Sequence, residues 1–245
     1  MKSRFLMLGD SAFTVEFPTL SGVDGARHVR ALRSRIEDKM TAGEITGVLD
    51  LVSASRSLTM VLDVFSADFD QVLETVKSLT DGTSDTEETA GRLWTLPVCY
   101  EGDYAPDLSE VAENAGMTTD DVIKIHSDTI YDVLLIGFQP GFPFLAEVDP
   151  KLRFPRRTSP RIKVPAGSVA IANNQTAIYP WESPGGWHLL GRCPVPLFDA
   201  NRNTPALIGP GDRVKFTPVS TADYEKLLQD FDAGKLDATT YGEDA

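Results

Sequence analysis

The segment VPAGSVAIANNQTAIYPWESPGGWHLLGR, residues 164–192, decides which kind of fold the second half of the chain can adopt. It contains three short apolar runs, at 168–172, 177–179 and 187–191, separated by stretches rich in proline, glycine and asparagine. Runs of this length with such boundaries predict short β-strands joined by shaped loops. We therefore expect a β-barrel or a β-sandwich in this half.

The distribution of proline extends this prediction along the chain. Of 16 prolines, 13 lie between Pro140 and Pro218, whereas residues 1–96 contain only Pro18. Proline lacks a backbone N–H and clashes with the preceding helical turn, so long helices are disfavoured where it is dense. Further strands are expected at 93–100, 131–138 and 213–217, the first of them at a sheet edge because of Pro97. Short helices are expected at 108–115 and 120–126. A last helix is expected at 224–231, before a frayed acidic tail.

The first 80 residues follow a different pattern. Strands are expected at 4–8 and 12–17, joined by the turn pair Gly9-Asp10. Apolar residues at helical spacing predict helices at 25–40 and 69–79, and β-rich stretches at 45–54 and 58–64 lie between them. The order ββαββα predicts a small α+β domain at 1–80. The polar, acidic stretch 81–92 predicts a linker to a second domain at 93–245.

Charge and cysteine content exclude several classes of protein. The chain of 245 residues has 23 Lys and Arg against 36 Asp and Glu, a formal net charge of −13. This balance opposes binding to nucleic acids and to anionic membranes, which require a basic face. Cys99 and Cys193 cannot form a disulfide framework, so we expect a reducing, cytoplasmic location. No stretch has the composition of a signal peptide or a membrane span, so a soluble protein is expected.

Two loops rich in glycine and proline are candidates for a binding site. Residues 136–144, IGFQPGFPF, combine a restricted backbone with aromatic side chains, and residues 182–187, ESPGGW, form a second such loop. Loops of this kind can wall a small-molecule pocket, although a structural corner over the barrel mouth is the alternative. The candidate binding residues are Phe138, Pro140, Gly141, Phe142, Ser183, Gly185, Gly186 and Trp187.

A basic segment interrupts the acidic chain. Residues 150–181 contain no Asp or Glu, yet six Lys or Arg residues fall within 151–163. Arginine presents a planar fork that suits a carboxylate or a phosphate, so Arg156, Arg157 and Arg161 are candidate anion contacts. The alternative is that these side chains form ion pairs with acidic residues elsewhere on the surface.

Standard catalytic signatures are absent from the sequence. It has no GxxxxGK[ST], GxSxG or HExxH motif, and its cysteine and histidine spacing predicts no metal site. His126 is the candidate acid–base residue, because it ends a helix that Thr118 and Asp121 begin as a capping box.

The motifs together resemble one known family. GFQPGFPFL (137–145), PRRTSPR (155–161), VPAGSVAIA (164–172), QTAIYP (175–180), ESPGGWHLLGR (182–192) and PLFD (196–199) are similar to the family of PxpB (the B-type subunit of 5-oxoprolinase), KipI and allophanate hydrolase subunit 1, also described as carboxyltransferase domain, subdomains C and D. FLMLGDSAFTVEF (5–17) resembles the amino-terminal part of that family. The resemblance covers nearly the whole chain.

The resemblance implies a fold and an activity. The fold is α+β, a small amino-terminal α+β domain followed by a cyclophilin-like β-barrel. The activity is that of an ATP-dependent 5-oxoprolinase, which converts 5-oxo-L-proline to L-glutamate. The implied partners are a larger paralogous subunit (allophanate hydrolase subunit 2 or PxpC type) and a barrel-type subunit (PxpA type), without which the chain is expected to be inactive. Two alternatives remain open, a component of a urea carboxylase or allophanate hydrolase and an inhibitor of a sensor histidine kinase.

This activity would give six of the candidate residues a task. Opening a lactam requires the substrate carboxylate to be held, the amide oriented and its oxygen activated at the expense of ATP. Arg156, Arg157 and Arg161 are expected to contact anions, Ser168 and Gln175 to hydrogen-bond the amide, and His126 to move a proton.

Overall fold

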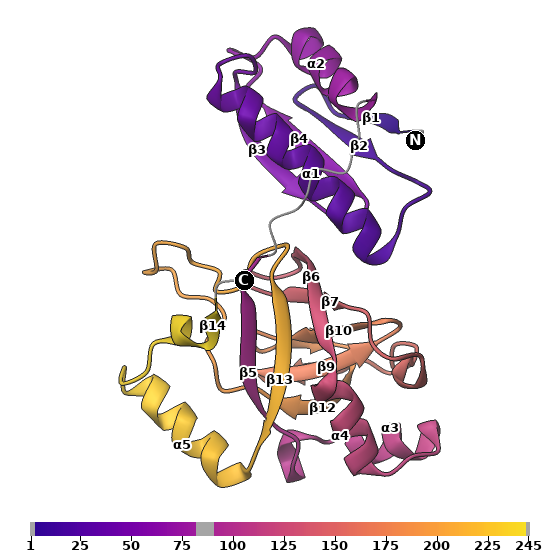
Figure 1. The fold of residues 1–245 in the computed structure, drawn as a ribbon, viewed down its shortest axis with the longest axis vertical. Coiled ribbons are helices and arrows are strands. Elements are labelled where there is room, and N and C mark those ends of the chain that lie inside the picture. Colours follow the sequence, from indigo (N-terminus) through magenta and orange to yellow (C-terminus); the bar gives the residue numbers. More distant parts are fainter. Residues whose placement is uncertain (1–2, 82–90, 244–245) are drawn as a thin grey trace. The chain divides into compact units, whose positions relative to one another are not determined.

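The computed structural model describes residues 3–81 and 91–243 and divides the chain into two units, Met1–Thr89 and Ala90–Ala245 (Figure 1). The expected linker at 81–92 falls largely outside the described residues, and each unit is described here by itself. None of the helices in the described ranges has the length and apolar character needed to span a lipid bilayer.

The first unit has the expected order ββαββα. Its elements are β1 (Arg4–Leu8), β2 (Ala12–Glu16), α1 (Gly22–Thr41), β3 (Val48–Ser53), β4 (Ser57–Leu62) and α2 (Phe69–Asp81). The strands form an antiparallel sheet in the order β1-β2-β4-β3. Both helices bury their apolar stripes against the same face of this sheet, around Phe13, Leu32 and Met60. The α+β class predicted from the sequence is therefore confirmed.

The second unit is a closed β-barrel. The sheet order is β12-β9-β10-β7-β6-β13-β5-β14, and a further pairing of β12 with β5 joins the ends into a ring of seven strands within the described residues. The expected barrel is thus confirmed. The strands are β5 (Leu93–Cys99), β6 (Ile130–Ile136), β7 (Pro143–Ala146), β9 (Ser168–Ala172), β10 (Gln175–Ile178), β12 (His188–Arg192), β13 (Arg213–Val219) and β14 (Gly242–Glu243).

Other elements surround the barrel. Strands β8 (Arg161–Val164) and β11 (Ser183–Gly185) pair with each other as a separate ribbon. Helices α3 (Leu108–Ala115) and α4 (Thr119–Asp128) lie in the connection between β5 and β6, and α5 (Thr221–Asp232) follows β13. The predicted capping box of α4 is present, since Thr118 accepts from the Asp121 backbone N–H and Asp121 accepts from that of Thr118.

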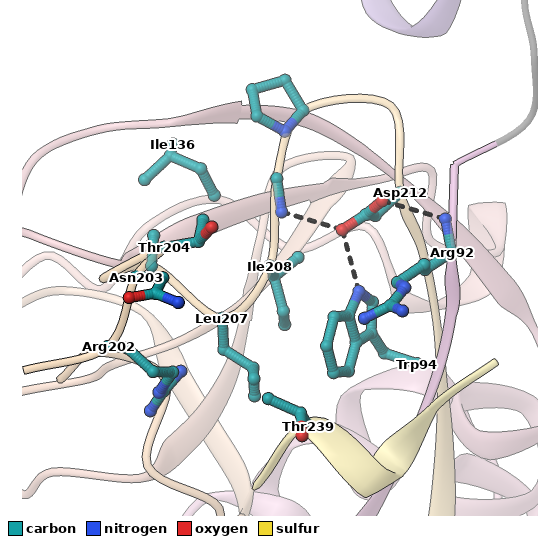
Figure 2. Close-up of a pocket in the computed structure, with 13 residues that line it drawn as sticks. Arg92, Trp94, Ile136, Arg202, Asn203, Thr204, Leu207, Ile208, Asp212 and Thr239 are labelled. Atoms are coloured by element: carbon teal, nitrogen blue, oxygen red, sulfur yellow. Dashed lines mark hydrogen bonds between the residues drawn. The ribbon is translucent and has the colours of Figure 1, made fainter. Parts of the chain in front are cut away.

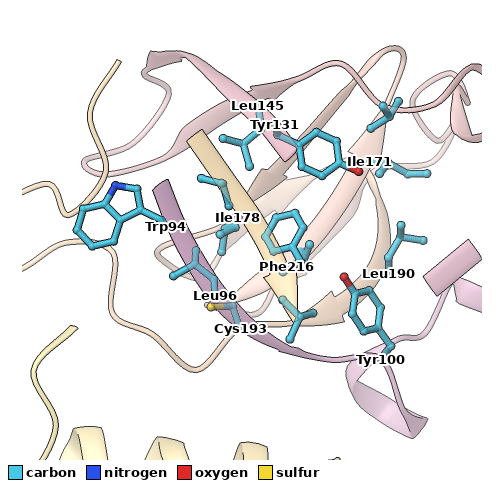
Figure 3. Close-up of a cluster of buried hydrophobic side chains, with 14 of the residues drawn as sticks. Trp94, Leu96, Tyr100, Tyr131, Leu145, Ile171, Ile178, Leu190, Cys193 and Phe216 are labelled. Atoms are coloured by element: carbon cyan, nitrogen blue, oxygen red, sulfur yellow. The ribbon is translucent and has the colours of Figure 1, made fainter. Parts of the chain in front are cut away.

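Apolar side chains from all seven strands fill the barrel interior, including Leu96, Tyr131, Leu145 and Phe216 (Figure 3). Side chains alternate across a strand, so successive residues face opposite sides. In β9, Val169 and Ile171 therefore join the interior cluster, whereas Ala170 and Ala172 belong to a second cluster on the outer face with Phe142, Tyr179 and Trp187. The wall of the barrel is covered on both sides here, and this second cluster builds the candidate site.

Two sequence expectations about the barrel were wrong. Pro97 was expected to mark an edge strand, but β5 has neighbours on both sides: it runs parallel to β13, while β14 pairs at Leu93 and Trp94 and β12 at Cys99. Pro97 lies between the residues that pair with β14 and the residue that pairs with β12, so its missing N–H removes no hydrogen bond from the sheet.

The acidic tail was expected to be frayed. Instead Ala238 is buried and β14 pairs with β5, with Gly242 against the Trp94 ring. The short strands β7, β8 and β11 were not predicted, because proline or alternating charge makes each of them resemble a loop in sequence.

Candidate functional site

A small aromatic cavity lies on the outer face of the barrel wall. Its volume is about 160 Å³. The alanines at 170, 172 and 177 leave room in this cluster for large rings from the loops. The lining residues are Phe138, Phe142, Phe144, Arg156, Tyr179, Pro184, Gly186 and Trp187. Five of the residues chosen from the sequence meet here, namely Phe138, Phe142, Arg156, Gly186 and Trp187.

Phe142 is the centre of the cavity wall. It is buried, and its ring centroid lies 4.8 Å from Phe144, 5.0 Å from Tyr179 and 6.4 Å from Trp187. The contacts with Tyr179 and Trp187 are edge-to-face, the arrangement that the charge distribution of aromatic rings favours. Phe138 packs on Phe142 at 5.4 Å while remaining 66% exposed at the rim. The rings therefore support one another as a rigid apolar wall.

The 137–144 loop has a backbone that only certain residues allow. Gly141 has a φ of 77°, and a Cβ there would lie 2.9 Å from the Cβ of Phe198. The loop closes through a hydrogen bond from Gly137 N to Phe142 O of 3.1 Å. The Pro140 carbonyl accepts the indole N–H of Trp181 at 3.1 Å. Gly141 and Pro140 thus shape the loop that presents Phe142, and neither of them lines the cavity.

The second loop approaches the cavity from the other side. A Cβ on Gly185 would lie 2.5 Å from the Tyr179 hydroxyl oxygen, so any larger residue at this position would have to displace the Tyr179 side chain. Gly186 and Trp187 line the cavity itself. Ser183 is buried in β11, and its hydroxyl has no hydrogen-bond partner in the described part of the chain. Burial raises the pKa of Tyr179 to about 12, so this phenol is neutral at pH 7.

Arg156 supplies a positive charge at this cavity. Its guanidinium lies 5.9 Å from the centroid of the Trp187 ring, within the range of a cation–π contact. The side chain is exposed and has neither an ion pair nor a hydrogen bond to any residue within 3–81 and 91–243. Arg156 is therefore available to an anion from solution.

Arg157 and Arg161 have the opposite arrangement. Arg157 Nη1 lies 3.2 Å from Asp107 Oδ1 and 3.0 Å from Glu110 Oε2, and Arg161 Nη2 lies 2.5 Å from Asp107 Oδ1. The hydrogen bond with Glu110 raises the pKa of Arg157. Both arginines are therefore paired with acidic side chains, as the second interpretation of the basic segment predicts. Neither of them lines the cavity.

His126 lies inside the barrel cluster and is fully buried. The Thr176 hydroxyl donates to the Ala170 carbonyl at 3.0 Å, so its oxygen accepts the Nε2–H of His126, also at 3.0 Å. Nδ1 then accepts the Tyr100 hydroxyl at 2.8 Å. Both ring nitrogens are satisfied in the neutral form, and the ring stacks on Phe216 at 4.8 Å. Burial lowers the pKa of His126 to about 3.

The wall of the barrel separates His126 from the aromatic cavity. Thr176 forms its hydrogen bond with His126 in the barrel interior, whereas Ala177, the next residue of β10, belongs to the outer cluster. Ser168 is buried in β9 and Gln175 begins β10, and neither of them lines the cavity. The structure does not bring His126, Ser168 and Gln175 together with the aromatic residues.

A larger cavity of about 710 Å³ lies elsewhere on this unit, with a floor of apolar residues such as Trp94, Leu207 and Ile208 (Figure 2). Asp212 holds its wall together, accepting from Arg92 N at 3.0 Å, Trp94 Nε1 at 2.8 Å and Gly209 N at 2.9 Å. That carboxylate therefore serves a structural role in the wall of this cavity. None of the residues predicted to form the site lines this cavity.

Sequence reasoning missed four residues of the candidate site and its support. Phe144, Tyr179 and Pro184 line the cavity, and Asp107 binds two of the predicted arginines. The first three lie within the motifs that carry the family resemblance, and Phe144 and Pro184 stand beside predicted site residues. That position in the motifs could have identified them. Asp107 gave only a weak signal, as the acidic residue before a short helix. Within the described ranges, no group of three or more His, Cys, Asp or Glu residues could hold a metal ion.

Comparisons with known proteins agree with this architecture. The family model "Carboxyltransferase domain, subdomain C and D" matches residues 3–208. A relative from Bacillus subtilis (strain 168), named as the B subunit of 5-oxoprolinase, is 37% identical over 233 residues, which cover 91% of this chain and 95% of the relative.

Solved structures show the same fold. The crystal structure of TTHA0988 matches with a TM-score of 0.73 and 39% identity over 85% of this chain, which spans 40% of that longer chain. The K. lactis urea amidolyase matches 98% of this chain, which spans 17% of that enzyme, with a TM-score of 0.76 and 21% identity, and it shows the fold alone. The chain therefore belongs to the family of carboxyltransferase domains, subdomains C and D, whose members include proteins named as the B subunit of 5-oxoprolinase.

Proposed function

We propose that this chain is a subunit of an ATP-dependent 5-oxoprolinase and that its aromatic cavity binds 5-oxo-L-proline. The name of the Bacillus subtilis relative supports the reaction, since that protein matches 91% of this chain. In this proposal the protein works in the cytoplasm with the two partner subunits that the family resemblance implies. The isolated chain is folded but inactive.

The observation that carries the proposal is the unpaired guanidinium of Arg156 beside an aromatic cavity of about 160 Å³. 5-Oxo-L-proline is a small, nearly flat ring with one carboxylate. Its ring would pack against Phe142 and Trp187, while Arg156 would hold the carboxylate through charge-assisted hydrogen bonds. The aromatic cavity offers apolar walls and one cation, and 5-oxo-L-proline has a small ring and one anion. This complementarity supports the substrate class.

The reaction assigns a limited task to this chain. ATP would activate the lactam oxygen by transferring a phosphoryl group to it, with release of ADP. Two water molecules balance the reaction: one adds to the activated carbon as the ring C–N bond breaks, and the other takes up the phosphoryl group, so that glutamate, ADP and phosphate are the products. The residues described here bind the ring and fix its carboxylate, which positions the amide for that attack. His126, Ser168 and Gln175 do not line the cavity, so the proposal assigns them no contact with the substrate.

Reconstitution of the complex tests this function. The chain is co-expressed with the two partner subunits, and glutamate formation from 5-oxo-L-proline is measured with and without ATP. Loss of one charge-assisted hydrogen bond costs about 1.5–3 kcal/mol, so Arg156→Ala should raise KM by roughly 10- to 100-fold. Lys151→Ala is the matched control, because Lys151 is an exposed cation of the same segment that does not line the cavity.

Three results would contradict the proposal. Turnover by the isolated chain would refute the requirement for partners, and absence of glutamate from the ATP-supplied complex would refute the reaction. An unchanged KM in Arg156→Ala would remove the aromatic cavity as the substrate site. Turnover of urea or allophanate instead would favour the urea carboxylase alternative, and kinase binding without turnover would favour the inhibitor alternative.

A further inference from the structure

The segment that carries Arg156 has no helix or strand of its own from 153 to 160, yet it is anchored on both sides of this residue. On one side, the Pro155 carbonyl accepts Nε2–H of His188 at 3.0 Å. On the other side, Arg157 N donates to the Gly186 carbonyl at 2.7 Å. Arg156 is the residue between these two anchors, and its side chain extends over Trp187. The position of its guanidinium therefore depends on how firmly the anchors hold.

Asp107 connects the anchored segment to the rest of the unit. Its side chain is 3% exposed, and Oδ1 contacts both Arg157 Nη1 and Arg161 Nη2. Oδ2 accepts the backbone N–H of Leu189 at 2.7 Å, and Asp107 N donates in return to the Leu189 carbonyl at 3.1 Å. One buried carboxylate thus joins the segment at two arginines to β12, two residues beyond Trp187.

We propose that Asp107 is a positioning residue for Arg156, holding residues 155–161 so that the Arg156 guanidinium stays at the mouth of the aromatic cavity. This inference rests on the proposed function of Arg156 as the contact for the substrate carboxylate. Asp107 does not line the cavity and does not touch substrate. It acts because an exposed arginine on an irregular segment would otherwise spread over many conformations, and a substrate would have to order it on binding.

The chemistry of the contact requires a carboxylate at this position. An asparagine offers a single acceptor oxygen in place of two, so it cannot serve both arginines and the Leu189 N–H together. It also removes the buried negative charge that pairs with two partly buried guanidinium groups. Glu110 provides a matched control, because its side chain is 51% exposed and contacts Arg157 alone among the described residues.

Hydrogen exchange of the full chain tests the anchoring without reference to any substrate. Asp107→Asn should speed exchange of the hydrogen-bonded amides within residues 155–161 by about ten-fold or more, above all that of Arg157, which donates to the Gly186 carbonyl, because local opening no longer breaks the two ion pairs. Glu110→Gln should change the same amides by less than about two-fold. Exchange in the first unit, residues 3–81, serves as the internal reference. Unchanged exchange at 155–161 in Asp107→Asn would overturn the inference.

A double-mutant cycle in the reconstituted complex tests the link to Arg156. Asp107→Asn should raise KM for 5-oxo-L-proline by about three- to ten-fold with kcat nearly unchanged, and should raise it no further in the Arg156→Ala background. A purely structural residue would lower activity equally in both backgrounds, and that additive result would overturn the inference. If Asp107→Asn does not fold, Arg157→Gln replaces it in both experiments, since Asp107 then keeps its contacts with Arg161 and Leu189.

The two experiments separate this inference from the proposed function. If the wild-type complex does not convert 5-oxo-L-proline, the proposed function fails, and the exchange experiment still decides whether Asp107 holds the segment. If the complex is active but the two substitutions are additive in KM, the proposed function stands and the positioning role of Asp107 is refuted.

Discussion

Lowering the pH from 7 to 5 should weaken the fold of the second unit through His126. Burial lowers the pKa of this imidazole to about 3 in the folded protein, whereas an unfolded histidine titrates near 6.5. The folded state therefore favours the neutral ring. The contribution of neutral His126 to the free energy of unfolding is complete above pH 6.5 and is lost as the pH falls toward 3. In this range the unfolded chain binds a proton at this residue and the folded chain does not.

The magnitude follows from the difference between these two pKa values. Between pH 7 and pH 5 the unfolded histidine becomes almost fully protonated, while the folded one stays neutral. At 1.36 kcal/mol per pKa unit, the free energy of unfolding falls by about 2 kcal/mol over this range from His126 alone. His126→Gln keeps hydrogen-bonding groups near Tyr100 and Thr176 but cannot titrate, so it should lack this part of the pH dependence.

Urea denaturation followed by tryptophan fluorescence measures the effect. All three tryptophans, Trp94, Trp181 and Trp187, lie in the second unit, so the signal does not report on the first. Carboxylates also titrate in this range, but they are common to both proteins and cancel in the comparison. The wild type should lose about 2 kcal/mol more than His126→Gln on going from pH 7 to pH 5.

Equal losses in the two proteins would refute the buried, neutral state of His126. The same variant also decides whether this residue moves a proton in catalysis. Because both ring nitrogens already have partners inside the barrel, His126→Gln should retain turnover in the reconstituted complex. A loss of kcat by about 100-fold or more, with KM unchanged, would support the acid–base role that the sequence predicts for His126.

Three further outcomes are expected. Limited proteolysis should cut within 81–92 and release two folded pieces, since this sequence is acidic and lacks apolar anchors; cleavage inside 45–64 instead would contradict the boundary. Thr118→Ala should lower the free energy of unfolding by about 1 kcal/mol in the fluorescence experiment, because it removes the capping box of α4. Gly185→Ala should raise KM, because a Cβ would lie 2.5 Å from the hydroxyl oxygen of Tyr179 and displace it; a wild-type KM would show that this wall can move.

Most helices and strands, and their order along the chain, could be predicted from local sequence patterns. Apolar periodicity in residues 1–80 predicted ββαββα, and proline density predicted short strands in the second half, because both signals act locally on the backbone. The strands β7, β8 and β11 and the pairing of the carboxy-terminal tail were missed. Proline or alternating charge makes the three strands resemble loops, whereas the tail depends on a partner strand far away in the sequence, as in the pairing of Gly242 with Trp94.

The aromatic residues of the candidate site could also be predicted from the sequence. Most of them are concentrated in two loops whose glycines and prolines restrict the backbone. Which face of a strand each residue would take was not readable. Alternation along β10 requires Thr176 and Ala177 to face opposite sides, but only the closure of the barrel makes one side the interior. That closure separates His126 from the aromatic cavity.

The assignment of charges depended on tertiary structure alone. Arg156 and Arg157 are neighbours in sequence with the same chemistry, and nothing local distinguishes them. Folding brings Asp107, fifty residues away, against Arg157, while Arg156 lies over Trp187 with no carboxylate partner among the described residues. An ion pair forms only where two distant segments meet within a few ångströms, so the sequence could supply the basic segment but only the fold could decide which arginine remains available to a ligand.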